Sequence, residues 1–407
     1  MPDLPAAAPE HGRFRLNLLI LSIVKFNFAS YLTIGLPLAV LPGFVHDGLG
    51  YNAFWAGLVI SLQYIATLLS RPHAGRYADV WGPKKVVVIG LVGCLLSGIC
   101  ILLSALSDGQ GVLSLVLLCL GRVILGVGQS FSGTGTSLWG VARVGSLHIG
   151  RVISWNGIVT YGAMAIGAPL GVVIFRSGGL LLLSSIIIAI CLLAIALALP
   201  RAAVKGSKAK PLPFRDVLSK VYGFGLILAM GSAGFGVIAT FITLFYQDKG
   251  WGGAAFALTM FSAAFVGTRL LFPNAINKLG GLRVASICFA VEAIGLFLVA
   301  GSFDPWMAKT GAFLTGAGFS LVFPAIGVVA VKVVPQQNQG SALATYTAFM
   351  DLSLGITGPI AGFIMSYAGV SLVYFLTALL VCLALFCTLR MIKRMPETAA
   401  AEIKENA

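Results

Sequence analysis

Long apolar segments alternate with short polar ones along almost the whole chain. A helix needs about 20 consecutive apolar residues to cross the hydrocarbon core of a bilayer. The pattern therefore predicts an all-α membrane protein with twelve transmembrane helices. These cover residues 17–44, 54–70, 86–107, 112–138, 152–175, 180–199, 221–246, 254–272, 284–302, 307–331, 341–366 and 370–390.

The composition excludes a water-soluble protein. Hydrophobic residues make up 58% of the chain and charged residues 10%, against roughly 25% charged residues in an average soluble domain. The 50 glycines fit close packing between helices, where small side chains let backbones approach each other in lipid. The seven cysteines all fall inside predicted spans and form no C-x-x-C pair, so they indicate packing, with neither a disulfide framework nor a metal site.

The net charge of +14 has an explanation in membrane topology. Lys and Arg gather in alternate loops, and by the positive-inside rule these loops and both termini face the cytoplasm. This predicts a multi-pass protein of a bacterial inner membrane, and it explains the charge without nucleic acid as a partner. The loops expected on the other side hold three cations and four acids, namely Arg176, Lys249, Lys309, Asp47, Asp108, Asp248 and Asp304.

The chain contains an internal repeat, which predicts two pseudo-symmetric six-helix bundles. A polar, basic segment at 200–220 reads as a cytoplasmic linker between an N-terminal bundle at 1–199 and a C-terminal bundle at 221–407. In such repeats the substrate site lies near the midplane between the halves, and access alternates as one half rocks against the other. The matching positions are Arg71, Gly82 and Lys85 with Arg269, Gly280 and Arg283, and Gly126, Gly128, Gly150 and Pro169 with Gly316, Gly318, Gly340 and Pro359.

The loop from Gly75 to Lys85 resembles the signature G-x-x-x-D-x-x-G-R-[RK] of the Major Facilitator Superfamily. A tight turn with basic anchors would explain Gly82, Lys84 and Lys85, but not the lone carboxylate Asp79 among cations. The resemblance implies a gating latch in which Asp79 lies at the N-terminus of the eleventh helix, near Ser341, where the helix dipole favours an anion.

Two further motifs carry the same resemblance. Arg122-Val-Ile-Leu-Gly126-Val-Gly128 is similar to the R-x-x-x-G-x-G signature of proton-coupled members. Arg122 lies near the midplane, where an arginine costs about 2.5–3.5 kcal/mol or more unless partners satisfy it, although a structural arginine bonded to helix carbonyls is the alternative. The fifth helix resembles an element of the antiporter branch at Gly162, Gly167, Pro169 and Gly171. The resemblance implies a role in efflux, and close packing between helices is the alternative explanation of these residues.

Over its whole length the chain resembles bacterial facilitator-superfamily transporters of the efflux-like YhhS/YfcJ group, on stretches such as 27–37 and 154–157. The resemblance implies the fold and a transport function. Arg122, Asp351 and the element of the fifth helix favour proton-coupled efflux of a small organic solute. Proton-linked uptake of a metabolite, and a sensor or scaffold with the same fold, stay as alternatives. We expect a monomer whose partners are its solute, protons and lipid. No motif of a soluble or intramembrane enzyme occurs, so no catalytic residue, cofactor or metal ligand is expected.

The candidate proton carriers are carboxylates, because all four histidines lie in loops or at span ends. Asp351 lies about ten residues into the eleventh helix and is the first choice, with Arg122 across the cavity as the cation that biases proton release. An ionised carboxylate is disfavoured away from water unless a cation is close. A buried carboxylate that only bonds a neighbouring hydroxyl or amide is the alternative for Asp351. Glu292, in the ninth helix, which the family fold places on the periphery, is the second candidate.

Polar and aromatic side chains near the middle of the spans are candidates for lining a substrate cavity. A few hydrogen-bonding groups among aromatic walls suit a small organic ligand. Each of them is as well suited to bond between helices as to contact the solute. The candidates are Asn27, Tyr31, Gln63, Tyr64, Gln129, Trp155, Asn156, Tyr161 and Tyr346.

Overall fold

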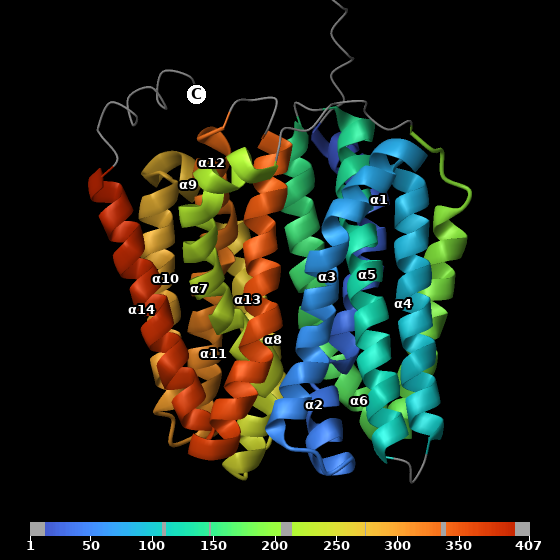
Figure 1. The fold of residues 1–407 in the computed structure, drawn as a ribbon, viewed down its shortest axis with the longest axis vertical. Coiled ribbons are helices and arrows are strands. Elements are labelled where there is room, and N and C mark those ends of the chain that lie inside the picture. Colours follow the sequence, from blue (N-terminus) through green and yellow to red (C-terminus); the bar gives the residue numbers. More distant parts are fainter. Residues whose placement is uncertain are drawn as a thin grey trace, which may run out of the picture.

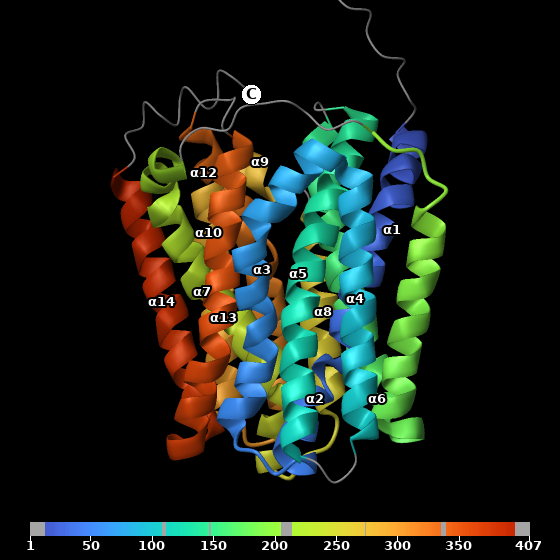
Figure 2. The ribbon, with the colours of Figure 1, turned by 45° about the vertical axis from the view of Figure 1, so that its right-hand side comes forward.

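The protein is a bundle of long helices that run roughly parallel to one axis (Figures 1 and 2). A computed structural model describes residues 13–107, 111–145, 148–204, 214–272, 274–334 and 339–394. No strand occurs in these ranges. The elements of the first half are α1 (Arg13–Leu38), α2 (Leu41–Gly43), the π-helical turn η1 (Phe44–Gly48), α3 (Ala53–Trp81), α4 (Pro83–Leu106), α5 (Gly111–Val144) and α6 (Ile149–Ala198).

The second half repeats this order after the segment that joins the two halves. Part of the predicted linker, residues 205–213, lies outside the described residues. The elements of the second half are α7 (Phe214–Asp248), α8 (Ala254–Leu271), α9 (Ala275–Leu279), α10 (Gly281–Ala300), α11 (Pro305–Ser320), α12 (Val322–Lys332), α13 (Gln339–Ala368) and α14 (Val370–Arg394).

Eleven helices of the described chain are long and apolar enough to cross a membrane, and α6 supplies two of the predicted spans. It leaves helical geometry at Gly178 and Gly179, where Gly179 adopts a φ of 64° that favours glycine. Lys84 at the start of α4 donates a hydrogen bond of 2.6 Å to the carbonyl of Leu199, the residue after α6, so the end of α6 lies beside the start of α4. The chain therefore crosses twice within this element, and the prediction of an all-α twelve-span membrane fold is confirmed.

Two prolines lie where the first span departs from a continuous helix. The first span contains Pro37 and Pro42; α1 ends at Leu38, and α2 begins at Leu41 with Pro42 in its first turn. Proline lacks the N–H that continues a helix and clashes with the preceding turn. The tenth span is likewise divided at Leu321 into α11 and α12.

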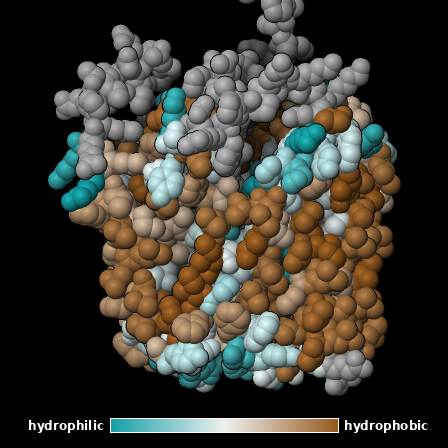
Figure 3. Space-filling view, in the orientation of Figure 1, coloured by the Kyte–Doolittle hydropathy of each residue, from teal (hydrophilic) through white to brown (hydrophobic). Residues whose placement is uncertain are grey.

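The sides of the bundle are apolar and its two ends are polar (Figure 3). Large exposed side chains on the sides include Leu69, Leu193 and Phe363, each more than half exposed. Soluble monomers rarely expose contiguous apolar surface on this scale. Hydrocarbon is the solvent for which such a surface is stable.

The internal repeat is visible in the backbone. Gly82 between α3 and α4 and Gly280 between α9 and α10 adopt almost the same conformation, with φ of 87° and 84° and ψ of 147° at both. A side chain on Gly126 would overlap the carbonyl oxygen of Gln63, and one on Gly316 would overlap that of Phe261 at the matching position of the other half. These small residues bring α5 onto α3, and α11 onto α8, in the same way.

Gly82, between α3 and α4, and Gly75, within α3, provide a test of this geometry. We expect Gly82→Ala to destabilise the protein by about 1–3 kcal/mol, because a residue with a side chain is strained at this φ and ψ. A Cβ there would also lie 2.9 Å from the Val204 carbonyl oxygen. Gly75→Ala is the matched control, since Gly75 lies within α3 and a Cβ there meets nothing within 4 Å. It should keep or raise the melting temperature. Equal losses in the two variants would contradict the interpretation.

Candidate functional site

The two halves meet along α3 and α13, whose facing surfaces consist of small residues. A side chain on Gly57 would overlap the backbone of Gly358, and one on Gly362 would lie 2.6 Å from the Ala53 carbonyl oxygen. Ser61 donates a hydrogen bond of 3.2 Å to the Leu354 carbonyl. Because these residues recur every three or four positions, they form one stripe on each helix. The contact closes the interface from the α2 end inward.

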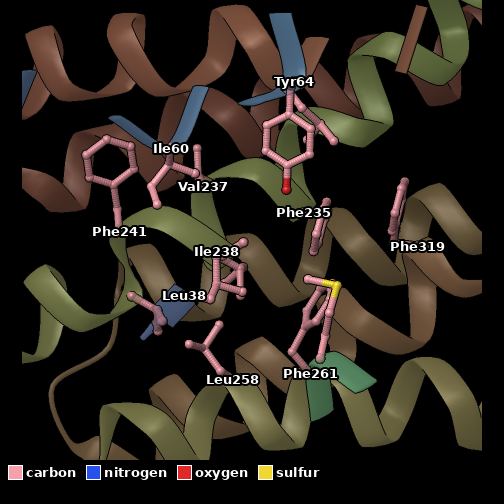
Figure 4. Close-up of a cluster of buried hydrophobic side chains, with 14 of the residues drawn as sticks. Leu38, Ile60, Tyr64, Phe235, Val237, Ile238, Phe241, Leu258, Phe261 and Phe319 are labelled. Atoms are coloured by element: carbon pink, nitrogen blue, oxygen red, sulfur yellow. The ribbon is translucent and has the colours of Figure 1, made fainter. Parts of the chain in front are cut away.

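A hydrophobic cluster fills the interface beside this stripe (Figure 4). Its members come from both halves and are at most 8% exposed. The close-up shows Tyr64 with its hydroxyl directed toward the ring of Phe235. The labelled members are Leu38, Ile60 and Tyr64 of the first half and Phe235, Val237, Ile238, Phe241, Leu258, Phe261 and Phe319 of the second.

An ion pair between Arg71 of α3 and Asp351 of α13 joins the halves where the stripe ends. The Arg71 Nη2 donates to Asp351 Oδ1 at 3.1 Å, and Nε donates to Oδ2. Both carboxylate oxygens are thus engaged in the planar fork that guanidinium groups form. Asp351 is 2% exposed, whereas the side chain of Arg71 is 25% exposed. The carboxylate of the pair is thus buried, whereas the arginine is partly accessible to solvent.

The cation in contact with Asp351 is Arg71. The role expected of Arg122, across the cavity from Asp351, stays a prediction. Arg122 is 0% exposed in α5, and none of its three side-chain nitrogens has a hydrogen-bond partner among the described residues. Its electrostatic neighbour is the Tyr64 hydroxyl. A buried guanidinium without a partner carries a high desolvation cost.

Several polar candidates form a layer in the first half next to the ion pair. Gln63 donates to Gln129 Oε1 at 2.5 Å, and Asn27 donates to Thr160 Oγ1 at 3.1 Å. Tyr31 lies between them, within electrostatic reach of Arg71 and Asp351, and its side chain meets Gln129 and Thr160. The Asn27 Oδ1 and Gln63 Oε1 atoms are buried and have no hydrogen-bond partner among the residues that the structure describes.

The remaining cavity candidates differ in what they contact. Tyr161 of α6 stacks on Phe265 of α8 across the interface, with ring centroids 3.5 Å apart. Trp155 donates to Asn17 at 3.3 Å and Asn156 donates to Ser137 at 3.1 Å, both within the first half. Tyr346 is fully buried within the second half and donates to the Phe323 carbonyl at 3.0 Å.

Glu292 of α10 lies inside the second half, away from the Arg71–Asp351 pair. It is 0% exposed, and within the described part of the chain neither carboxyl oxygen has a hydrogen-bond partner. Its Oε1 lies against Gly234 of α7, where a side chain would overlap it. Its counterpart in the repeat is Cys94, which contacts Ser30 in the equivalent gap between α4 and α1.

The glycine motifs act as packing seams. A side chain on Gly128 would press on Gly90 and Cys94 of α4, and those on Gly167 and Gly171 on Gly35 and Leu36 of α1. At Gly162 nothing lies within 4 Å, so close packing does not explain this glycine. Pro169 lies within the same stretch of α6.

The gating loop is described only in part. Gly82 supplies the positive φ of the turn, Lys84 binds the end of α6, and Lys85 is exposed. The side chains of Asp79 and Ser341 lie outside what the structure describes. The latch between them stays a prediction.

Two interface arginines, Arg71 and Arg269, were missed as site residues when the sequence was read alone. Both lie near the ends of apolar spans and count there as loop cations. The signal that could have found them is the repeat, which aligns Arg71 with Arg269 at the same position of each half. In the structure both face the other half: Arg71 meets Asp351, and a guanidinium nitrogen of Arg269 lies against Gly157 of α6.

Two pseudo-symmetric six-helix bundles that meet at a buried polar layer define a membrane transporter. The family model of the Major Facilitator Superfamily matches residues 26–274 and 253–407. The chain belongs to this superfamily, whose members are transporters and not enzymes.

The chain is similar along its whole length to curated transporters of enteric bacteria. It is 70% identical over 397 residues to the "Uncharacterized MFS-type transporter YhhS" of Escherichia coli K12, covering 98% of each chain. It is 68% identical over 396 residues to the protein of that name from Salmonella typhimurium, covering 97% of this chain and 98% of the relative. The resemblance to this group is confirmed.

Solved structures share the fold at low sequence identity. The D-xylose-proton symporter matches with a TM-score of 0.75 at 16% identity, over 91% of this chain and 97% of that one. The nucleoside transporter NupG matches with a TM-score of 0.72 at 16% identity, over 92% and 99%. At this identity the likeness shows the fold alone.

The Arg71–Asp351 pair predicts a specific pattern of stability. Arg71→Gln should lower the melting temperature, because it leaves the buried carboxylate without its cation. The double variant Arg71→Gln/Asp351→Asn should recover part of the loss, with a coupling of about 0.5–3 kcal/mol, as is typical of residues in contact. The melting temperatures of the purified single and double variants give the comparison. Strictly additive effects would contradict the pairing.

Proposed function

We propose that the chain exports a small organic solute across the bacterial inner membrane, with protons as the coupling ion. The observation that carries the proposal is the buried Arg71–Asp351 ion pair between the two halves. A solute-binding fold without coupling would not need a charged pair at the surface that must separate during alternating access.

Protonation of Asp351 offers a way to open this interface. The neutral acid loses most of its attraction to Arg71, whereas the ionised form holds α3 and α13 together. Arg71 is partly exposed, so water and protons have a route to the pair from the side away from the Gly57–Gly358 contact. Loading and release of one proton would then change the stability of the closed state.

The proposed orientation rests on the distribution of cations. The end of the bundle where α1 begins carries the basic loops, among them Arg76, Lys84, Arg143 and Lys332. The positive-inside rule then puts this end in the cytoplasm. In that orientation the interface is closed on the periplasmic side by α3, α13 and the contact of Gly43 with Gln247. We propose further that the Asp79 latch closes the cytoplasmic side, and that the protein acts as a monomer.

The proposed direction rests on the fifth-helix element of the antiporter branch. Its Gly167 and Gly171 pack directly on α1, the helix that carries Asn27 and Tyr31. If this packing is rigid, α1 and its polar side chains move together with α6 when access alternates. Proton-linked uptake would use the same ion pair, so direction has its own test.

One prediction of the proposed function concerns the residue that carries the proton. Asp351→Asn should abolish transport driven by a pH gradient while solute exchange without a gradient persists, because Asn keeps the size and loses the titration. Proteoliposomes with an imposed pH gradient measure both activities. Glu292→Gln is the matched control, since that carboxyl is equally buried and contacts neither Arg71 nor the other half. Loss in Glu292→Gln with pH-driven transport retained by Asp351→Asn would move the carrier to Glu292.

Another prediction of the proposed function concerns the direction of transport. A solute screen in inside-out and right-side-out vesicles should show proton-driven accumulation in inside-out vesicles, as expected of an exporter. Accumulation only in right-side-out vesicles under an inward proton gradient would establish uptake instead. No movement of any solute under any gradient would favour the sensor or scaffold alternative.

A further inference from the structure

A groove on the outer side of the second half lies apart from the interface between the halves. It is lined by α7, α13 and α14 and has a volume of about 320 Å³. In Figures 1 and 2, α13 and α14 lie close together at the turn that joins them and diverge toward the other end of the bundle, with α7 between them. Thus α7 forms the floor of the groove, and α13 and α14 form its walls.

The lining of the groove is almost entirely apolar. Its three hydroxyl groups donate to carbonyls of the protein itself: Ser353 to Ala229 at 2.6 Å, Thr357 to Ser353 at 2.7 Å, and Thr377 to Val373 at 2.7 Å. This leaves no free side-chain donor in the lining that the structure describes. Burying a polar group without a hydrogen bond is costly, so the groove suits an apolar occupant.

The groove opens on the apolar side of the bundle. Large aliphatic side chains, each more than a third exposed, form its rim. An apolar cavity left empty forfeits the dispersion contacts of its walls, and water does not fill it. In a bilayer the apolar group available at this depth is a lipid acyl chain. The rim residues are Leu226, Leu352, Ile356, Ile360, Leu376 and Leu380.

The groove extends toward the end of the bundle where α14 finishes. Phe349 of its lining packs edge to face against the exposed Tyr222 of α7, with ring centroids 5.9 Å apart. Beside Tyr222, a side chain on Gly223 would lie 3.1 Å from Met391 Cε in the last turn of α14. These contacts place this end of the groove between the early turns of α7 and the end of α14.

Exposed cations lie next to these contacts. Lys220 precedes Tyr222 by two residues, and Arg390 and Lys393 lie within two residues of Met391. All three cations are exposed. Basic clusters at the ends of membrane helices attract anionic lipid headgroups. The groove thus offers an apolar lining to an acyl chain and positive charge to a phosphate group at its end.

The groove lies on the face of α13 opposite its contact with α3. Asp351, Gly355 and Gly358 face α3, where Asp351 meets Arg71 and side chains on the two glycines would overlap α3. Residues such as Ile356 and Ile360 line the groove instead. Positions four apart share one face of a helix, so the two sets lie on different faces. An occupant of the groove therefore packs against the back of the helix that carries Asp351.

We propose that the groove binds one acyl chain of an anionic phospholipid, whose phosphate lies beside Lys220 and Arg390. The bound lipid stabilises the packing of α13 against α7 and α14. The site lies outside the interface between the halves, and its occupation requires neither a solute nor a proton.

Melting temperatures of the purified protein in maltoside micelles test the proposal. The protein is titrated with phosphatidylglycerol, with phosphatidylethanolamine of the same acyl chains, and with glycerophosphoglycerol, which has the headgroup but no chain. Phosphatidylglycerol should give the larger, saturable rise, because a ligand that binds only the folded state stabilises it. The chain-free headgroup should give none. Absence of a rise with phosphatidylglycerol, or an equal rise with either of the other two compounds, would overturn the proposal.

Charge variants locate the headgroup. The double variant Lys220→Gln/Arg390→Gln should reduce the rise with phosphatidylglycerol to that with phosphatidylethanolamine. Arg143→Gln/Lys332→Gln is the matched control, since it removes two exposed cations of α5 and α12, neither of which lines the groove. It should keep the full difference between the two lipids. A difference that persists in the first double variant would show that the phosphate binds elsewhere.

A variant that fills the groove locates the acyl chain. Ala229→Phe places a ring on the floor of the groove and should abolish the rise with phosphatidylglycerol. Ala189→Phe, at an exposed position of α6 in the first half, should keep it. An undiminished rise in Ala229→Phe would contradict the site. A wild-type dimer that Ala229→Phe converts to a monomer would show that a second copy fills the groove, and would also overturn the proposal.

Discussion

The ion pair between Arg71 and Asp351 is the interaction on which the arrangement of the two halves depends. Among the described residues, no other ion pair joins helices of different halves. The pair lies where the close contact of α3 with α13 ends. A charged pair at a buried surface is stable only while both partners remain together and ionised. In the proposed mechanism protonation of Asp351 weakens this interface, whereas contacts between apolar side chains do not respond to protons.

Small residues make that ion pair possible. Gly57, Ser61 and Gly358 allow α3 and α13 to approach backbone to backbone, which sets the distance at which the two longer side chains meet. In lipid there is little hydrophobic drive between helices, so close packing and hydrogen bonds provide the attraction. Beyond this stripe of small residues the two helices are joined by the ion pair, and Arg71 remains partly exposed. Along α3 and α13, the close backbone contact is thus followed by the contact between two charged side chains.

The repeat supplies the scaffold, and departures from it supply the chemistry. Gly126 and Gly128 pack as Gly316 and Gly318 do, and the turns at Gly82 and Gly280 have the same geometry. The charged residues do not follow the symmetry. Arg122 corresponds to Ala312, Asp351 to Tyr161, and Glu292 to Cys94. At the interface, the position that holds Asp351 in the second half holds Tyr161 in the first, so the two halves present different groups to each other.

The sequence by itself determined the membrane class, the helices and the repeat, because hydrocarbon imposes about 20 apolar residues on each crossing and leaves no alternative to helical hydrogen bonding. It also located Asp351 and Arg122 as groups that burial makes exceptional. It did not determine their partners, since a residue at the end of an apolar span, such as Arg71 or Arg269, looks like a loop cation until neighbouring helices are in place. Only the tertiary structure decided that Asp351 meets Arg71, that Arg269 faces Gly157, and that Tyr346 bonds within its own half. These contacts join positions up to 280 residues apart, and they depend on the rotation and depth of helices packed against each other, which periodicity within one helix does not encode.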